Sequence, residues 1–458
     1  HGYACLMVDS LQLGEIEATH HGLYRYVLWW WNSRGYTPAG VEAWNAVRSV
    51  DYLTSRPEID PARIGATGRS GGGIGSWWIA ALDSRIAAAV PVAGIANLKN
   101  HVVDGCVEGH CDCMYPVNTY RWDHVLIAAL VAPRPLLVTN SDKDTIFPLD
   151  GVIDIYNQTH ALYKTLGAGA NIGLHITEGP HKDTQPLRIG AANWFHRFLK
   201  GGERTDIIPG TAPPVLDLAD LRVFDQLPAD QRNTTIHDTF VPAAKHTVPT
   251  SKEAWEKTRD SLYESLRTRV FAGWPSAPGA LATAADGRTL TFNSQSPYRL
   301  TVTNSNSIAL GENFHPRGTG STAWTTDRRA HTHIRRRFAL LGQTLAGMQV
   351  YDTVRATQAL GDQKITLRAS GDLAAVALYA SLFADNIGAL HLTDLPPTHQ
   401  SKSAPDLLNV LRYLDIPQAL ALAAERTQVH LHRTDPIVAD FATKTLSILG
   451  TPQNLSIH

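Results

Sequence analysis

Two patterns of hydrophobic residues alternate along residues 1–202. Short apolar runs typical of buried strands lie at 3–9, 63–68, 86–94, 134–140 and 172–179. In the intervening segments apolar residues recur every three to four positions, which predicts helices over 39–56, 72–83, 151–168 and 184–202. Buried strands that alternate with helices indicate a parallel sheet covered on both faces. We therefore expect an α/β domain over residues 1–202.

The chain opens inside an apolar run, "HGYACLMVDS", with no initiator methionine and no signal peptide. Residues 3–9 of this run are predicted to form a strand, with Cys5 as a small core residue. A domain that begins on a bare apolar strand leads us to expect a preceding segment outside this sequence. Any export signal would lie in that segment, and a secreted or periplasmic location is the expectation.

A connector follows the first domain. Residues 203–250 are rich in proline and irregular, and "TSKEAWEKTRDSLYESLRTRVF" then predicts a helix. We expect Thr250 to cap this helix and Glu253 to complete a capping box. Residues 203–274 are therefore assigned to a connector and a helix.

Residues 275–458 repeat the pattern of the first domain in degenerate form. Three pairs of segments match in the same order: 43–53 with 350–360, 66–82 with 367–383, and 128–144 with 421–435. The alternative is that helix–strand units resemble one another by chance.

Charge and hydropathy narrow the class of partner. The 458 residues hold 41 basic and 42 acidic side chains, for a net charge of −1, and no basic block stands out. This balance argues against nucleic acid and acidic membrane surfaces as partners. No apolar run approaches the length of a membrane span.

One serine lies among glycines between a predicted strand and a predicted helix. Ser70 stands in "GRSGG", which fits the G-x-S-x-G pattern of a nucleophile elbow. Such an elbow is a sharp, strained turn, and small neighbours are needed on either side of the serine. It also directs the backbone N–H of Gly71 toward the place where an oxyanion would form. The alternative is a glycine-rich turn that only packs a helix on a sheet.

The residues that a nucleophilic serine needs follow in the order acid, then histidine. Asp142 and Asp144 come after the strand at 134–140, and we favour Asp144 because it lies deeper in the loop, four residues before a proline. His181 follows the strand at 172–179, whereas His175 lies within that strand and is expected to pack. Because the ends of parallel strands converge on one edge, Ser70, Asp144 and His181 are predicted to meet.

The first 200 residues resemble α/β-hydrolases of the acetylxylan esterase and dienelactone hydrolase type. The resemblance rests on "EIDPARIGATGRSGGG", "AALDSRIAAAVPVAG", "APRPLLVTNSDKDTIFPLDG" and "EGPHKD". It implies a catalytic triad of Ser70, Asp144 and His181, with three strands and a second oxyanion donor before His1. It also implies acyl transfer that needs no metal or organic cofactor.

The resemblance makes a serine carboxylesterase the expected function. We expect it to act on small acyl esters, most of all acetyl groups of plant polysaccharide. Two alternatives stay open: a serine peptidase of the prolyl-oligopeptidase kind, and a non-catalytic carbohydrate-binding relic. Residues 275–458 would be a degenerate hydrolase-like domain, because Gly371 aligns with Ser70 and no loop histidine follows Asp435.

Several residues near the predicted site are candidates for substrate binding. Trp29, Trp30 and Trp31 suit a sugar-binding cleft, although such clusters more often pack in cores or caps. His20 and His21 are placed at the rim of the pocket with the same reservation. The residues retained as substrate-binding candidates are His21, Trp30 and Arg69, which lies next to Ser70.

Three cysteines cluster in "DGCVEGHCDCMY" around His110. The spacing of Cys106, Cys111 and Cys113 is not that of a standard zinc framework. We expect a disulfide from Cys106 to Cys111 or Cys113, which is typical of an exported protein, and no metal site.

Overall fold

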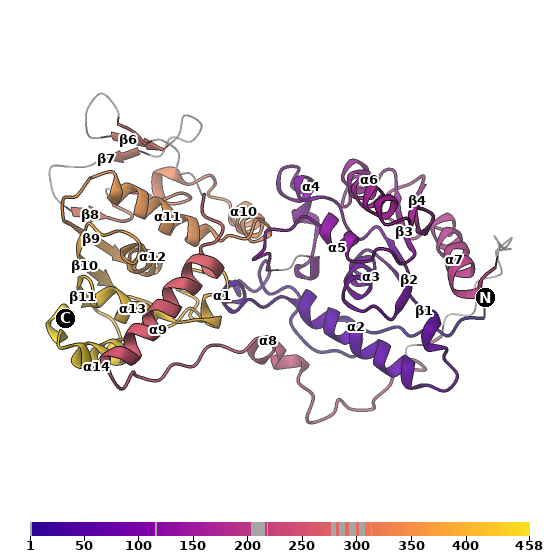
Figure 1. Cartoon of the computed structure of the whole chain (residues 1–458), viewed down its shortest axis with the longest axis horizontal. Coiled ribbons are helices and arrows are strands. Elements are labelled where there is room, and N and C mark those ends of the chain that lie inside the picture. The colour runs from indigo at the N-terminus through magenta and orange to yellow at the C-terminus, as the bar shows by residue number, and fades with distance from the viewer. Residues whose placement is uncertain are drawn as a thin grey trace. The chain divides into compact units, whose positions relative to one another are not determined.

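The computed structural model describes residues 2–114, 117–202, 216–217, 219–275, 281–283, 289–292, 299–301, 307–312 and 314–458. It contains two compact units, and Figure 1 labels their elements. Unit 1 comprises His1–His21, Thr37–Pro116 and Trp122–Phe240, and unit 2 comprises Gly22–Tyr36, Val117–Arg121 and Val241–His458. These bounds differ from the expected ones, because two short early segments and the helix after residue 250 group with unit 2.

A four-stranded parallel sheet forms the centre of unit 1. Its strands are adjacent in chain order: β1 (Ile64–Arg69), β2 (Ile86–Val92), β3 (Leu136–Ser141) and β4 (Ile172–Thr177). The longer helices are α2 (Pro38–Ser55), α3 (Gly71–Leu82), α6 (Leu149–Thr165) and α7 (Gln185–Lys200). Shorter helices are α4 (Leu98–Val102), α5 (Val125–Ala129) and α8 (Ile236–Thr239). The predicted strands from residue 63 onward and all four predicted helices are therefore present.

Helix α7 covers one face of this sheet. Its Leu187 joins Val90, Val92 and Leu137 in a buried cluster, and further apolar side chains of α7 pack against that cluster. Glycine allows close contact there, because a Cβ at Gly65 would lie 2.6 Å from the Phe195 ring.

The predicted strand at residues 3–9 is wrong for the described structure. This segment has no strand hydrogen bonds, and Cys5 is exposed rather than buried in a core. Met7 is 89% exposed. A strand needs a partner for its backbone N–H and C=O groups, and the described residues offer none to this segment.

Unit 2 is built around a five-stranded parallel sheet of order β12-β11-β10-β9-β8. Its strands are β8 (Ser307–Ala309), β9 (Ile365–Ser370), β10 (Ile387–Thr393), β11 (Gln428–His432) and β12 (Leu455–Ile457). Its helices are α1 (Trp30–Arg34), α9 (Lys252–Ser265), α10 (Arg328–Leu340), α11 (Leu345–Gln358), α12 (Asp372–Ser381), α13 (Ile416–Ala424) and α14 (Asp440–Leu449). A small antiparallel sheet consists of β5 (Leu281–Thr283), β6 (Thr289–Phe292) and β7 (Arg299–Thr301).

Helix α9 starts one residue later than the sequence pattern predicts. Ser251 has extended backbone geometry, and its side chain accepts a hydrogen bond from the N–H of Ala254 at 3.2 Å. The third helical residue is therefore Ala254, so Thr250 is not the cap and Glu253 cannot complete the predicted capping box.

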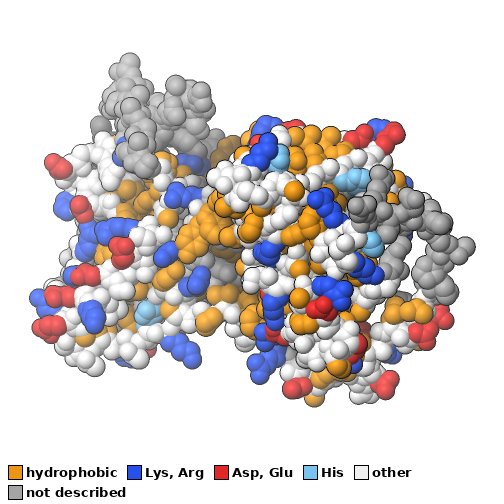
Figure 2. Space-filling model, turned by 45° about the vertical axis from the view of Figure 1, so that its right-hand side comes forward, with side chains coloured by type: hydrophobic (Ala, Val, Ile, Leu, Met, Phe, Trp, Pro, Cys, Tyr) orange, Lys and Arg blue, Asp and Glu red, His pale blue; other side chains and the backbone are white. Residues whose placement is uncertain are grey.

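Basic and acidic side chains are interspersed on the face of the molecule shown in Figure 2, as the near-zero net charge leads one to expect. In the part of the chain that the structure describes, no helix combines the length and apolar character required to cross a membrane.

Candidate active site

Ser70 occupies a strained turn between β1 and α3. Its φ is 58° and its ψ −116°, a region that side-chain-bearing residues rarely enter. The Ser70 N–H donates to the carbonyl of Val92 at 3.0 Å, which ties the turn to the end of β2.

The glycines around Ser70 are required by close backbone contacts. A Cβ at Gly68 would lie 2.6 Å from the Gly72 backbone, and one at Gly73 would lie 2.4 Å from the carbonyl oxygen of Val92. Both distances are shorter than van der Waals contact allows. The glycine-rich sequence therefore permits the strand to turn directly into the helix.

The first turn of α3 lies beside a cavity of about 380 Å³. Gly71, the first residue of α3, lines this cavity together with Gly72 and His21. A backbone N–H at the start of a helix has no acceptor within the helix and is available to an anion. Gly71 therefore has the position expected of an oxyanion donor.

Asp144 and His181 are joined by a hydrogen bond. His181 Nδ1 lies 2.7 Å from Asp144 Oδ2, and Asp144 is buried. The other carboxylate oxygen of Asp144 accepts from the N–H groups of Ile146 and Phe147, both at 2.9 Å. Burial alone would raise the pKa of Asp144, but the hydrogen bonds from His181 and these N–H groups hold it below its usual value. Asp144 is thus an ionised partner fixed against His181.

Asp142 has a different partner. Its carboxylate accepts from the N–H of Gly179 at 2.8 Å, and so it joins the loops that follow β3 and β4. Asp142 therefore holds these two loops together, whereas Asp144 contacts the histidine.

The elbow and the histidine loop are neighbours. Arg69 Nη1 donates to the carbonyl of His181 at 3.5 Å, and the Phe147 ring lies 5.7 Å from the His181 ring. Among the described residues, no hydrogen bond joins the Ser70 hydroxyl to His181. Such bonds are often long in unliganded enzymes and shorten when substrate binds.

The substrate-binding candidates have different surroundings. His21 lines the cavity next to Gly71, and Arg69 contacts the His181 loop. Trp30 begins α1, which groups with unit 2, and does not line this cavity. Its neighbours Trp29 and Trp31 are buried, and Trp29 stacks under the guanidinium of Arg335 at 3.7 Å, so these two tryptophans pack within unit 2.

A buried histidine cluster supports the Asp144 loop, and no pattern in the sequence indicates it. His110 Nε2 lies 3.1 Å from the Ile146 carbonyl oxygen, and its ring packs 4.8 Å from Phe147. The His101 ring lies 4.9 Å from that of His110 and 5.0 Å from that of His124. Burial, and then its two histidine neighbours, lower the pKa of His101 well below the usual value. These residues come from separate segments, so only the fold brings them together.

The predicted disulfide pairing is wrong. Cys111 bonds Cys113, and Cys106 is a free thiol whose sulfur lies 3.9 Å from the Thr145 carbonyl oxygen. Cys106 begins a short 3₁₀ turn at Cys106–Gly109 that directs it to the loop after β3. Cys111 and Cys113 lie with their Cα atoms 5.5 Å apart, which is within reach of a disulfide.

Comparison with known proteins relates the first part of the chain to hydrolases. The Prolyl oligopeptidase family profile matches residues 30–168. "Putative hydrolase YtaP" of Bacillus subtilis is 29% identical over 202 residues, which cover 43% of this chain and 66% of the relative. A 4-O-methyl-glucuronoyl methylesterase of Schizophyllum commune is 28% identical over 187 residues, covering 35% of this chain and 47% of the relative. The chain thus spans about half to two thirds of the length of these relatives.

Two solved structures are also similar. A glucuronoyl esterase from Caldicellulosiruptor kristjansonii shares 22% identity at a TM-score of 0.33, over 41% of this chain and 56% of that one. Methylesterase BT1017 shares 23% identity at a TM-score of 0.34, over 50% of this chain and 49% of that one. The parallel sheet, the elbow and these sequence relatives together identify an α/β-hydrolase fold.

Proposed function

We propose that this protein is a serine carboxylesterase with Ser70 as nucleophile, His181 as general base and Asp144 as the orienting acid. The observation that carries the proposal is the 2.7 Å bond between Asp144 and His181, on loops adjacent to the strained turn at Ser70. With Nδ1 held by Asp144, the Nε2 atom of His181 is left to exchange a proton with the serine.

The proposed chemistry proceeds in two halves. Ser70 Oγ attacks the ester carbonyl while His181 takes its proton, and the Gly71 N–H stabilises the oxyanion. His181 then protonates the departing alcohol, and Asp144 stabilises the charged imidazole. Water, deprotonated by His181, releases the acid from Ser70 and completes the cycle.

The substrate proposed is an ester of plant polysaccharide, with acetyl groups as our specific candidate. The names of the curated relatives favour a second ester, the methyl ester of a 4-O-methylglucuronoyl group. The two differ in which side carries the sugar: the alcohol in an acetyl ester and the acid in a glucuronoyl ester. A peptidase activity is the third candidate, because a Prolyl oligopeptidase family profile matches residues 30–168.

We propose further that unit 2 is a hydrolase-like repeat without catalysis. Apart from the short α4, which unit 1 has between β2 and α5, the order α2-β1-α3-β2-α5-β3-α6-β4 matches α11-β9-α12-β10-α13-β11-α14-β12. Gly371 takes the place of Ser70, and the adjacent Ser370 is the last residue of β9, one position before the turn. A site without its nucleophile loses nearly the whole effect of a triad.

The experiment that tests this proposal measures hydrolysis of three substrates by the full-length protein: acetylated xylo-oligosaccharide, methyl 4-O-methylglucuronate and a prolyl peptide. We expect turnover of an ester that the Ser70→Ala variant loses by roughly 10⁶-fold. The Ser370→Ala variant is the matched control and should retain turnover. Ester hydrolysis that survives in Ser70→Ala, or cleavage of the peptide alone, would overturn the proposal.

A further inference from the structure

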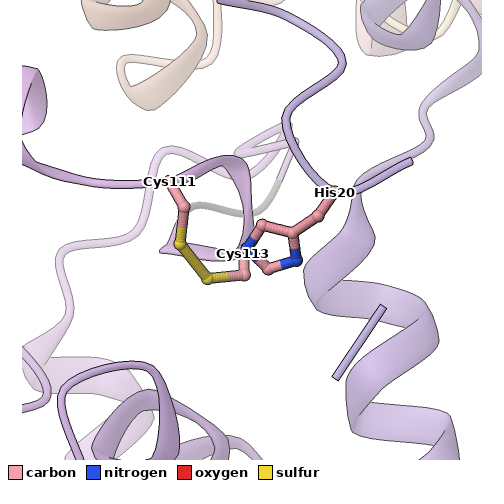
Figure 3. Close-up of side chains that lie close together, drawn as sticks. All are labelled: His20, Cys111 and Cys113. Atoms are coloured by element: carbon pink, nitrogen blue, oxygen red, sulfur yellow. A yellow bond between two sulfur atoms is a disulfide. The ribbon is translucent and has the colours of Figure 1, made fainter. Parts of the chain in front are cut away.

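A second group of reactive side chains lies beside the elbow. Cys111, Cys113 and His20 each offer one ligand atom, and these atoms all lie within 4.8 Å of one another. Figure 3 shows the His20 ring next to Cys113, and the yellow bond joins the sulfur atoms of Cys111 and Cys113. His20 and Cys113 are only 6% and 3% exposed, and Cys111 is partly buried.

His20 has the environment of a metal-binding histidine. Glu42 Oε1 lies 3.0 Å from His20 Nδ1. Histidines that bind metals usually turn one ring nitrogen to a carboxylate and offer the other to the metal. Glu42 comes from α2, which fixes the carboxylate on a rigid element.

We propose that the reduced form of this group binds Zn²⁺ through the thiolates of Cys111 and Cys113 and the imidazole of His20, with Glu42 as the orienting carboxylate. Two sulfur ligands and one nitrogen ligand select zinc among the common divalent ions. Three protein ligands leave a fourth position open. The same cavity is lined by His20, Cys111, Cys113 and Gly71, so that position faces the space beside the elbow.

Metal binding requires that the Cys111–Cys113 disulfide be reduced first. A dithiol or phosphine reductant supplies two electrons, the S–S bond breaks, and two protons add to the sulfurs. Zn²⁺ then displaces both protons as it binds the thiolates. The disulfide and the metal site are therefore alternative states of the same two sulfur atoms.

Cys106 provides a matched control. It lies in the same loop region but outside the group, with its sulfur beside Thr145, and burial raises the pKa of its thiol. A raised pKa disfavours the thiolate that a metal requires. Cys106→Ser should thus leave metal binding unchanged.

The test uses the full chain, reduced with a phosphine, and Co²⁺ as a spectroscopic substitute for Zn²⁺. We expect one equivalent of Co²⁺ to give a thiolate-to-cobalt charge-transfer band, which Zn²⁺ then abolishes. Cys113→Ser should lose much of the band, His20→Ala should weaken Co²⁺ binding, and Glu42→Gln should weaken it by about 10- to 100-fold. Circular dichroism of each variant establishes that it is folded.

Three results would overturn the proposal: a reduced protein with no band, a His20→Ala variant of unchanged affinity, or a disulfide that resists reduction in the folded protein. None of them bears on Ser70, Asp144 or His181, so the esterase proposal would stand or fall separately.

Discussion

Ser70 in unit 1 and Gly371 in unit 2 lie in two turns with the same backbone geometry. Their φ angles are 58° and 61°, and their ψ angles −116° and −129°. The Gly371 N–H donates to Thr393 at 2.9 Å, as that of Ser70 donates to Val92 at 3.0 Å. The turn therefore depends on the strand–helix junction. In unit 1 a serine adopts this backbone conformation and is strained by it.

The correspondence extends to the loop of the acid. Asp435 follows β11 as Asp144 follows β3, and its carboxylate accepts from the N–H of Ile437 at 3.0 Å, as Asp144 does from Ile146. Unit 2 thus has an aspartate in the same loop geometry but no serine at the turn. Under the proposed function, this backbone geometry alone is not sufficient for catalysis.

The two sheets differ on the face that α7 covers in unit 1. Val90 and Leu137 are apolar there, whereas the positions that match them in register are His391 and His430. These two rings stack at 4.5 Å. Burial, then Arg368 and the neighbouring histidines, lower the pKa of His391 to about 4. The same plan of strands therefore supports an apolar face in one unit and a histidine face in the other.

The largest difference in kcat between variants of the two units should come from Asp144 and Asp435. We expect Asp144→Asn to lower kcat by about 10⁴-fold, because His181 would lose the partner that fixes its tautomer. Asp435→Asn should leave kcat unchanged and stability nearly so, because the asparagine side-chain oxygen can still accept from the Ile437 N–H. Steady-state kinetics with the best ester of the substrate panel measures both. Equal losses in the two variants would show that unit 2 takes part in the chemistry.

A second contrast concerns the glycines of the active elbow. Gly73→Ala should lower the free energy of unfolding by about 1–3 kcal/mol, because its Cβ would lie 2.4 Å from the Val92 carbonyl oxygen. Gly75→Ala, in the same helix with open space around it, should be neutral or stabilising by about 0.5–1 kcal/mol. Denaturant unfolding followed by circular dichroism makes the comparison. A Gly73→Ala variant as stable as Gly75→Ala would mean that the close contact is not needed.

A third and smaller effect is the pH dependence of the free energy of unfolding, to which both units contribute. His101 and His391 have lowered pKa values, so they stay neutral in the folded protein while the unfolded chain takes up protons below about pH 6.5. The free energy of unfolding should therefore fall as pH falls below 6.5. His391→Gln should remove the part of this slope between about pH 6.5 and 4. A profile identical to that of the unaltered protein would contradict the burial argument.

The sequence pattern predicted the elements of unit 1 and the order of the proposed triad because both depend on local chemistry. Alternating strands and helices, glycines around Ser70, and an acid and a histidine after successive strands are all visible along the chain. Contacts between distant segments were not visible along the chain: the Glu42–His20 pair and the histidines behind Asp144 arise only when the chain folds. The apolar run at residues 3–9 misled us because hydrophobicity alone does not supply a strand partner.

The central claim is that Ser70 is the nucleophile and that the turn at Gly371 is inert. The most direct test is to treat the full-length protein with a fluorophosphonate and map the adduct by tandem mass spectrometry. We expect a single adduct on Ser70, lost in Ser70→Ala and His181→Ala and retained in Ser370→Ala. An adduct on Ser370 or on any other residue of unit 2, or labelling that persists in Ser70→Ala, would contradict the account.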